Sequence, residues 1–466
     1  MTDSVFGRAW VQERLHHAVS ALGGEVAGAE AVFRGTEAHH SRIAESTLLQ
    51  AGQIDEGRLT LRAVIDGREA RAMTTDLSDA GLALCAQMAL ERAKAAPRAA
   101  EPRLLPAPRS LEDQSAACTD AATASLDAPT KARWLAEALR AHEKDDLALA
   151  GRFHTGLVTT AVYSSRGVNS FHQGSFSDLC LSALERPAGH LASAYRARFD
   201  AAITESDVDR MWREVRDECV RAHDPQRIDP GSWDVVLAPA AVTELLEWLG
   251  DIAFTSKSVD DGMSFISANL GERVTGEAIT ITDDASMPAG IGVPMPFDVE
   301  GQPKHRVELV ESGVAKGIVH DTQSGQKAGC QTTGHAQIDD EFPASGSRPA
   351  HLHIQAGEAT LDELIGQVDR GLFITRLHYV NGMIEPRRAV MTGLLRDGAF
   401  LIEDGKLGRA VQTLRFTDSI LEAFGRIPGA GGVSRDVEAH TSWFNPRTCH
   451  VAPYLYVPGL AFTSGR

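Results

Sequence analysis

Positive charge and long apolar runs are both scarce in this sequence, and each scarcity excludes a class of partner. The 466 residues include 46 lysines and arginines against 63 aspartates and glutamates, which gives a formal net charge of −17. Because nucleic acids and anionic membrane surfaces attract basic faces, this charge argues against both as partners. No apolar run approaches the roughly 18 residues that predict a membrane-spanning helix, so we expect no membrane contact.

Cysteine is sparse as well. The six cysteines are scattered along the chain and form no CxxC pair. So few thiols in a chain of this length are typical of a reduced protein rather than of a disulfide-stapled one. The first residues, MTDSVFGRAWVQERLHH, contain no apolar segment of the kind that a secretory signal carries. These features together predict a cytoplasmic protein.

Motifs for several common chemistries are missing too. The chain has no GxxxxGKS or GxxxxGKT loop for phosphates, no GxGxxG turn after a strand, and no GxSxG turn for a nucleophilic serine. A Ser-His-Asp triad follows no fixed sequence pattern, so that alternative stays open.

The patterns that are present mix helices and strands in the first half, whereas glycine-punctuated strands dominate the second. RLTLRAVIDGREARA alternates apolar and polar residues around Asp66-Gly67, which predicts a hairpin turn. Gln173-Gly174 predicts a break between strands, and Leu361–Gly371 reads as one helix. Helices and strands followed by a mostly β half favour an α+β fold.

A domain boundary is predicted at HDPQRIDPG, which holds two prolines and a glycine. We therefore expect two domains. Residues 1–225 would form a mixed α/β domain, and residues 226–466 a mostly antiparallel β domain.

One amphipathic helix follows the apolar run DVVLAP near the start of the second domain. Its apolar residues recur at helical spacing, which predicts a buried stripe: Val242, Leu245, Leu246, Leu249, Ile252 and Ala253. The opposite face carries Glu244, Glu247 and Asp251.

Seventeen histidines raise the question of a metal site. His440, Cys449 and His450 are the strongest candidates, since a thiolate and two imidazoles suit zinc. Their spacing matches no zinc finger, and an adjacent Cys-His pair cannot easily chelate one ion from a strand. His142-Glu143 is the only His-Glu pair, and no second histidine follows one turn later.

The order of several longer segments resembles the TldD/PmbA (TldE) family. The segments are RLTLRAVIDGREARAMTTDLSDAGLALCAQMALERAKAA, SSRGVNSFHQGSFSDLCLSA, DVVLAPAAVTELLEWL, PMPFDVEGQPKHRVELVESGVAKGIVHDTQSGQKAG, TTGHA and GLFITRLHYVNGMIEPRRAVMTGLLRDGAFLIEDGKLGRAVQTLRFTDSILEAF. Together they cover most of the chain. The resemblance implies a cytoplasmic two-domain α+β protein that assembles into a zinc metallopeptidase for short, unfolded peptides, which reach the metal through an enclosed cavity.

In that family a TldD-type subunit carries HExxxH on a helix after a V-V-L strand, and a cysteine near the C-terminus can complete the zinc site. A PmbA/TldE-type subunit lacks the motif and pairs with the first. The helix after DVVLAP has no histidine here. The resemblance therefore implies a non-catalytic subunit with no cofactor of its own, whose HExxxH-containing partner holds the zinc. Cys449, near the position of the family cysteine, would be a buried thiol.

The same resemblance suggests where a peptide would bind. His335 and His351 stand where relatives often have asparagine, and both could lie on the peptide-binding wall. The strands around 376–380 and 393–400 are further candidates, with Arg376 and His378 as peptide contacts.

Two alternatives stay open. One is a regulatory binding protein, because the family has been described as a modulator of DNA gyrase. The other is a stand-alone metallopeptidase whose metal site has moved to His440, Cys449 and His450.

Overall fold

The computed structural model describes residues 4–98, 105–109, 111, 114–140, 146–185, 192–286, 291–337, 346–442 and 448–465. Within these ranges no helix combines the length and the apolarity that a membrane crossing requires. His142 and Glu143 lie outside the described residues.

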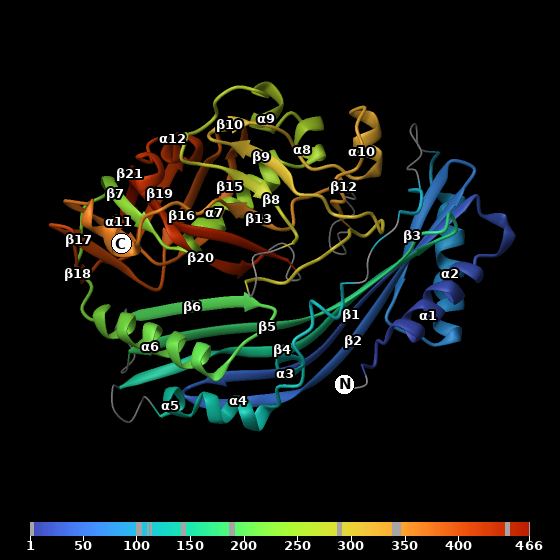
Figure 1. The fold of residues 1–466 in the computed structure, drawn as a ribbon, viewed down its shortest axis with the longest axis horizontal. Coiled ribbons are helices and arrows are strands. Elements are labelled where there is room, and N and C mark those ends of the chain that lie inside the picture. Colours follow the sequence, from blue (N-terminus) through green and yellow to red (C-terminus); the bar gives the residue numbers. More distant parts are fainter. Residues whose placement is uncertain are drawn as a thin grey trace.

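A long antiparallel sheet occupies the first half of the chain (Figure 1). Among the described residues it has six strands in the order β3-β2-β1-β4-β5-β6. Their bounds are β1 (Gly28–Ala44), β2 (Thr47–Ile65), β3 (Arg68–Thr74), β4 (Leu147–Ser164), β5 (Asn169–Glu185) and β6 (Ser193–Asp200). The Asp66-Gly67 turn joins β2 to β3 as predicted, and both residues have positive φ, 47° and 72°.

Helices cover one face of this sheet (Figure 1). Their bounds are α1 (Arg8–Ser20), α2 (Asp79–Ala95), α3 (Ala121–Ala124), α4 (Ala128–Trp134), α5 (Ala136–Leu139) and α6 (Glu205–Arg221), with a 3₁₀ turn at η1 (Gly23–Glu25). Side chains alternate along a strand, so Phe33 and Phe153 pack beneath the helices. Val32 and Val162 instead face the second half of the chain.

The second half is built around another sheet, with thirteen strands in the described part of the chain. They are β7 (Gly231–Leu237), β8 (Ile281–Asp283), β9 (Val307–Glu311), β10 (Val314–Ala315), β13 (Leu352–Ile354), β14 (Arg370–Ile374), β15 (Leu377–Glu385), β16 (Val390–Leu395), β17 (Ala399–Glu403), β18 (Lys406–Ala410), β19 (Leu414–Ser419), β20 (Val433–Thr441) and β21 (Cys449–Gly465). The short strands β11 (Ala336–Gln337) and β12 (Gly346–Ser347) pair separately. β21 contacts β7, β13, β19 and β20, so it organises the sheet.

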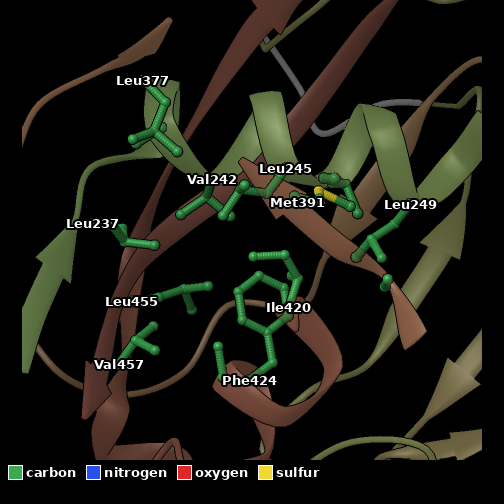
Figure 2. Close-up of a cluster of buried hydrophobic side chains, with 14 of the residues drawn as sticks. Leu237, Val242, Leu245, Leu249, Leu377, Met391, Ile420, Phe424, Leu455 and Val457 are labelled. Atoms are coloured by element: carbon green, nitrogen blue, oxygen red, sulfur yellow. The ribbon is translucent and has the colours of Figure 1, made fainter. Parts of the chain in front are cut away.

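Short helices surround the second sheet, and one longer helix, α7 (Pro239–Ala253), packs on it. The others are α8 (Ser256–Asp260), α9 (Phe265–Ala268), α10 (Thr322–Lys327), α11 (Leu361–Gly366), α12 (Ile420–Gly425), η3 (Pro386–Arg388) and η4 (Gly429–Gly432). Figure 2 shows Val242, Leu245 and Leu249 of α7 packed among side chains of the sheet and α12. The predicted apolar stripe is confirmed, because all six of its residues are buried.

The fold is α+β, as the sequence indicates, whereas two local predictions are wrong. Gln173-Gly174 does not interrupt a strand, because both residues pair with β4 inside β5. Gly174 instead lies against the backbone at Cys118, which accepts a hydrogen bond from Ser175. A glycine in a strand thus marks a close backbone approach here.

The helix predicted over Leu361–Gly371 ends at Gly366, and Arg370 already begins β14. A Cβ at Gly371 would lie 2.3 Å from the carbonyl oxygen of Asp234, on the neighbouring parallel strand β7. Strand pairing decides the structure of this segment. The division of the chain at residues 225 and 226 stays a prediction.

Candidate functional site

A cavity of about 540 Å³ lies between the first sheet and the second half of the chain. The first sheet supplies Arg152 and His154 from β4, Asp178 from β5, and Tyr195 and Ala197 from β6. The other wall is formed by Ala240, Thr243, Glu244 and Glu247 of α7, by Arg376, and by His440, Thr441, Ser442 and His450. Residues 152 and 154 point into the cavity because they are out of phase with Phe153, which faces the helices.

Both arginines of the cavity are held by carboxylates. Arg152 makes a two-bond ion pair with Asp178, with N···O distances of 2.7 and 3.1 Å. Arg376 donates to Asp397 at 2.7 Å, and its guanidinium stacks 3.8 Å from the ring centre of Tyr195. Such planar pairs fix a guanidinium in one orientation. The positive charges of the cavity are therefore largely neutralised in place.

The polar face of α7 brings two carboxylates to the opposite wall. Glu244 and Glu247 lie one helical turn apart, where side chains meet. Burial, with the charge of Glu247 second, raises the pKa of Glu244 to about 7. Glu247 accepts a hydrogen bond from the Ser442 hydroxyl. The α7 wall of the cavity therefore holds two carboxyl groups close together.

His440 and His450 face each other across the β20–β21 ladder, so both reach the cavity. The Nδ1 atom of His450 accepts a hydrogen bond of 3.1 Å from the backbone N–H of Leu352. A neutral imidazole that accepts at Nδ1 carries its proton on Nε2. His440 lies 3.3 Å from Glu438. Burial opposes ionisation of Glu438, but His440 and nearby arginines hold the pKa of that carboxyl at about 2.

The third candidate ligand, Cys449, does not line the cavity. It is completely buried, and burial raises the pKa of its thiol to about 12, so it stays protonated. The Nδ1 lone pair of His450 already accepts a backbone N–H. The described residues form no group of three or more His, Cys, Asp or Glu side chains arranged for a metal. The structure therefore brings His440 and His450 to the cavity but not Cys449.

His335 and His351 lie in the core rather than on the cavity wall, and both have 0% exposure. Nε2 of His335 is 2.8 Å from the Asp283 carboxylate, which also accepts from the backbone N–H of His351 at 2.9 Å. Burial opposes ionisation of Asp283, but the His335 ring holds the pKa of this carboxyl well below its usual range. The structure places neither histidine where a peptide could touch it.

The remaining two suggested peptide contacts differ. Arg376 lines the cavity, whereas His378 is half-buried on β15, against the ring of Tyr379, and does not. Sequence reasoning did not select Glu244, Glu247, Arg152 or Tyr195 as site residues. A signal was available for the first two, because paired glutamates opposite an apolar helical stripe must face either solvent or a partner surface.

Comparisons with known proteins agree with this architecture. A family model described as the PmbA/TldA metallopeptidase C-terminal domain matches residues 230–464. A metalloprotease of Methanothermobacter thermautotrophicus is 23% identical over 52% of each chain. The metalloprotease TldD homolog of Haemophilus influenzae is 27% identical over 42% of this chain and 38% of that protein. The chain thus matches 52% of the length of the first of these curated relatives and 38% of the second.

Two solved structures share the fold over nearly the whole chain. TldE from Thermococcus kodakarensis has a TM-score of 0.84 at 18% identity and covers 98% of this chain and 100% of its own. A protein of Thermotoga maritima, described as a candidate modulator of a DNA gyrase, has a TM-score of 0.76 at 19% identity, over 94% and 96% of the two chains. At these identities the likeness shows the fold alone. Since the family model spans half of its length, the chain belongs to the PmbA/TldD metallopeptidase family.

Proposed function

We propose that this protein is the non-catalytic subunit of a two-chain zinc metallopeptidase that processes short, unfolded peptides. The observation that carries the proposal is the polar face of α7. Where the family's zinc-binding helix would need imidazoles, this helix presents Thr243, Glu244 and Glu247 to the cavity. Carboxylates are harder ligands than imidazole or thiolate and suit zinc less well. A partner chain with HExxxH would supply the metal.

The cavity supports a peptide-holding role for this chain. Its volume of about 540 Å³ lies within the range of ligand-binding clefts, and its arginines are fixed by ion pairs. Side chains that are already fixed before binding lose little conformational entropy when a ligand binds. This chain would hold part of the peptide while the partner's zinc acts on it.

Location in the cytoplasm is part of the same proposal. All six cysteines are free thiols, which suits a reducing compartment.

Activity measurements with and without the partner test the proposal. The purified chain alone is expected to bind no stoichiometric zinc and to cleave no peptide. Cleavage should appear on mixing with an HExxxH-containing family member from the same source, and a chelator should abolish it. Chelator-sensitive cleavage by the lone chain would refute the proposal.

Blocking the cavity gives a second test. Ala240→Trp puts an indole at the cavity wall and is expected to lower the activity of the two-chain complex. Ala51→Trp, on an exposed part of β2, is the matched control and should leave activity unchanged.

Two structural neighbours are described as candidate modulators of DNA gyrase, which favours one alternative function, regulation of gyrase. Recovery of gyrase on affinity purification, without any HExxxH protein, would favour that rival. The formal charge of −17 gives no support to a direct contact with DNA.

A further inference from the structure

The carboxyl group of Glu244 faces the cavity, and the charge of Arg376 offsets only part of the rise in its pKa that burial and Glu247 cause. Within the described residues this carboxyl group makes no hydrogen bond and no ion pair, although the side chain is largely enclosed. Its nearest like charge is Glu247, one turn further along α7. An enclosed carboxylate beside a second one is costly unless a positive group joins them.

Neither arginine that lines the cavity forms an ion pair with Glu244, although the charge of Arg376 lowers the pKa of this carboxyl group. Arg152 is engaged by both oxygens of Asp178, and Arg376 by Asp397 and the Tyr195 ring. Both are therefore fixed on partners other than Glu244. Within the described residues no basic side chain forms an ion pair with Glu244, so this carboxyl group is open to a cationic group of a guest in the cavity.

A second, independent feature points to the chemistry of that guest. The side chain of His450 is only 4% exposed and lines the cavity. Its Nδ1 accepts from Leu352, so Nε2–H is a donor directed toward α7. Glu247 Oε1 lies 3.9 Å from this nitrogen, beyond hydrogen-bonding distance, and Nε2 makes no hydrogen bond with the part of the chain that is described.

The cavity thus holds a buried donor, His450 Nε2–H, and a carboxyl group, Glu244, that has no ion pair among the described residues. Together they are complementary to a cation that carries a carbonyl oxygen close by. The amino-terminal residue of a peptide has this combination, because its ammonium group is two bonds away from its first carbonyl carbon. A lysine side chain offers the ammonium without the adjacent carbonyl. We infer that the cavity binds the free amino terminus of a peptide, with the ammonium at Glu244 and Glu247 and the first carbonyl at His450 Nε2–H.

This inference deepens the proposed function and rests on it for the identity of the guest as a peptide. The protein would then bind peptides specifically through their free amino terminus. Chains with a blocked amino terminus, and internal segments of longer chains, would be excluded.

Calorimetric titration of the full chain, alone and with its partner, tests the inference with three peptides of one length. The first is a tetra-alanine amide with a free amino terminus, and the second is its N-acetylated form. The third is an N-acetylated tetrapeptide amide with one lysine. The free amine is expected to bind at least tenfold more tightly than either acetylated peptide. Equal binding of the first two peptides, or no binding of any, would overturn the inference. Preference for the lysine peptide would overturn the assignment to the amino terminus.

Two variants test whether the preference for the free amine arises in the cavity. Glu244→Gln should reduce the preference for the free amine to less than threefold, whereas Glu358→Gln, at an exposed site, should preserve it. If Glu244→Gln fails to fold, competition by methylammonium on the unaltered protein replaces it. Methylammonium should displace the free-amine peptide, and failure to do so would count against the inference.

The two proposals can fail separately. If the complex cleaves free and acetylated peptides equally fast in a zinc-dependent reaction, the proposed function is supported and the amino-terminal binding site is refuted. If the protein binds the free-amine peptide selectively but no complex cleaves it, the amino-terminal binding site is supported and the proposed peptidase function is refuted.

Discussion

Replacing Glu244 by glutamine should stabilise the protein in a pH-dependent way. Burial, with the charge of Glu247 second, raises the pKa of Glu244 from 4.5 to about 7. One pKa unit corresponds to about 1.4 kcal/mol, so holding this carboxylate ionised in the folded protein costs roughly 3 kcal/mol. Glutamine keeps the shape of the side chain and cannot ionise.

The sign follows from where the proton is held. Between pH 4.5 and about 7 the folded protein retains the proton of Glu244, while the unfolded chain loses it. The native state therefore binds more protons, and the free energy of unfolding falls as pH rises through this window. Below pH 4.5 both states are protonated. The variant should lie within about 1 kcal/mol of the unaltered protein at pH 5 and exceed it by roughly 3 kcal/mol at pH 8.

Urea denaturation of both proteins at pH 5, 6.5 and 8 measures this difference. The other titratable and charged groups around the cavity are common to both proteins, so their contributions largely cancel: Arg152, His154, Asp178, Tyr195, Glu247, Arg376, His440 and His450. A stability difference that does not change with pH, or a variant that is less stable at pH 8, would refute the reasoning. Glu358→Gln, on the exposed surface, should change stability little at any pH.

Three further predictions concern packing and thiol chemistry. Leu245→Ala should lower the free energy of unfolding by about 2–5 kcal/mol, because the side chain is 1% exposed and its loss leaves a cavity; urea denaturation measures it. Gly301→Ala should lower the free energy of unfolding by about 1–3 kcal/mol in the same assay, because φ is +67° and the new Cβ would lie 2.5 Å from Val168 of the first half of the chain. An unchanged denaturation midpoint would contradict this prediction. Iodoacetamide should modify the exposed Cys330 in the native protein and the buried Cys449 only after denaturation, as peptide mass mapping would reveal; early labelling of Cys449 would disprove its burial.

Local patterns predicted those elements whose cause is local. The Asp66-Gly67 hairpin forms because two adjacent residues tolerate positive φ. The buried stripe of α7 follows from residues at helical spacing, which any apolar surface can cover. Where a glycine lies against another segment, as Gly174 and Gly371 do, the sequence pattern was misread as a break or as helix.

The candidate site was harder to predict because its residues come from distant segments. His440 and His450 share a face only because the β20–β21 register pairs them. Cys449 is next to His450 in sequence, yet alternation along the strand takes its side chain into the core. His335 and His351 are polar residues whose burial depends on Asp283, fifty or more positions earlier in the chain.

The amino-acid sequence by itself determined the acidic charge, the α+β class, the family resemblance, and a helix after DVVLAP without histidine. Each of these depends on composition or on neighbours within a few turns. Only the tertiary structure decided that this helix turns Glu244 toward a cavity whose other wall is the first sheet. The burial of Glu244 and the charges around it depend on which surfaces pack together. In this cavity those surfaces come from segments some 90 residues apart in the sequence, from Arg152 to Glu244.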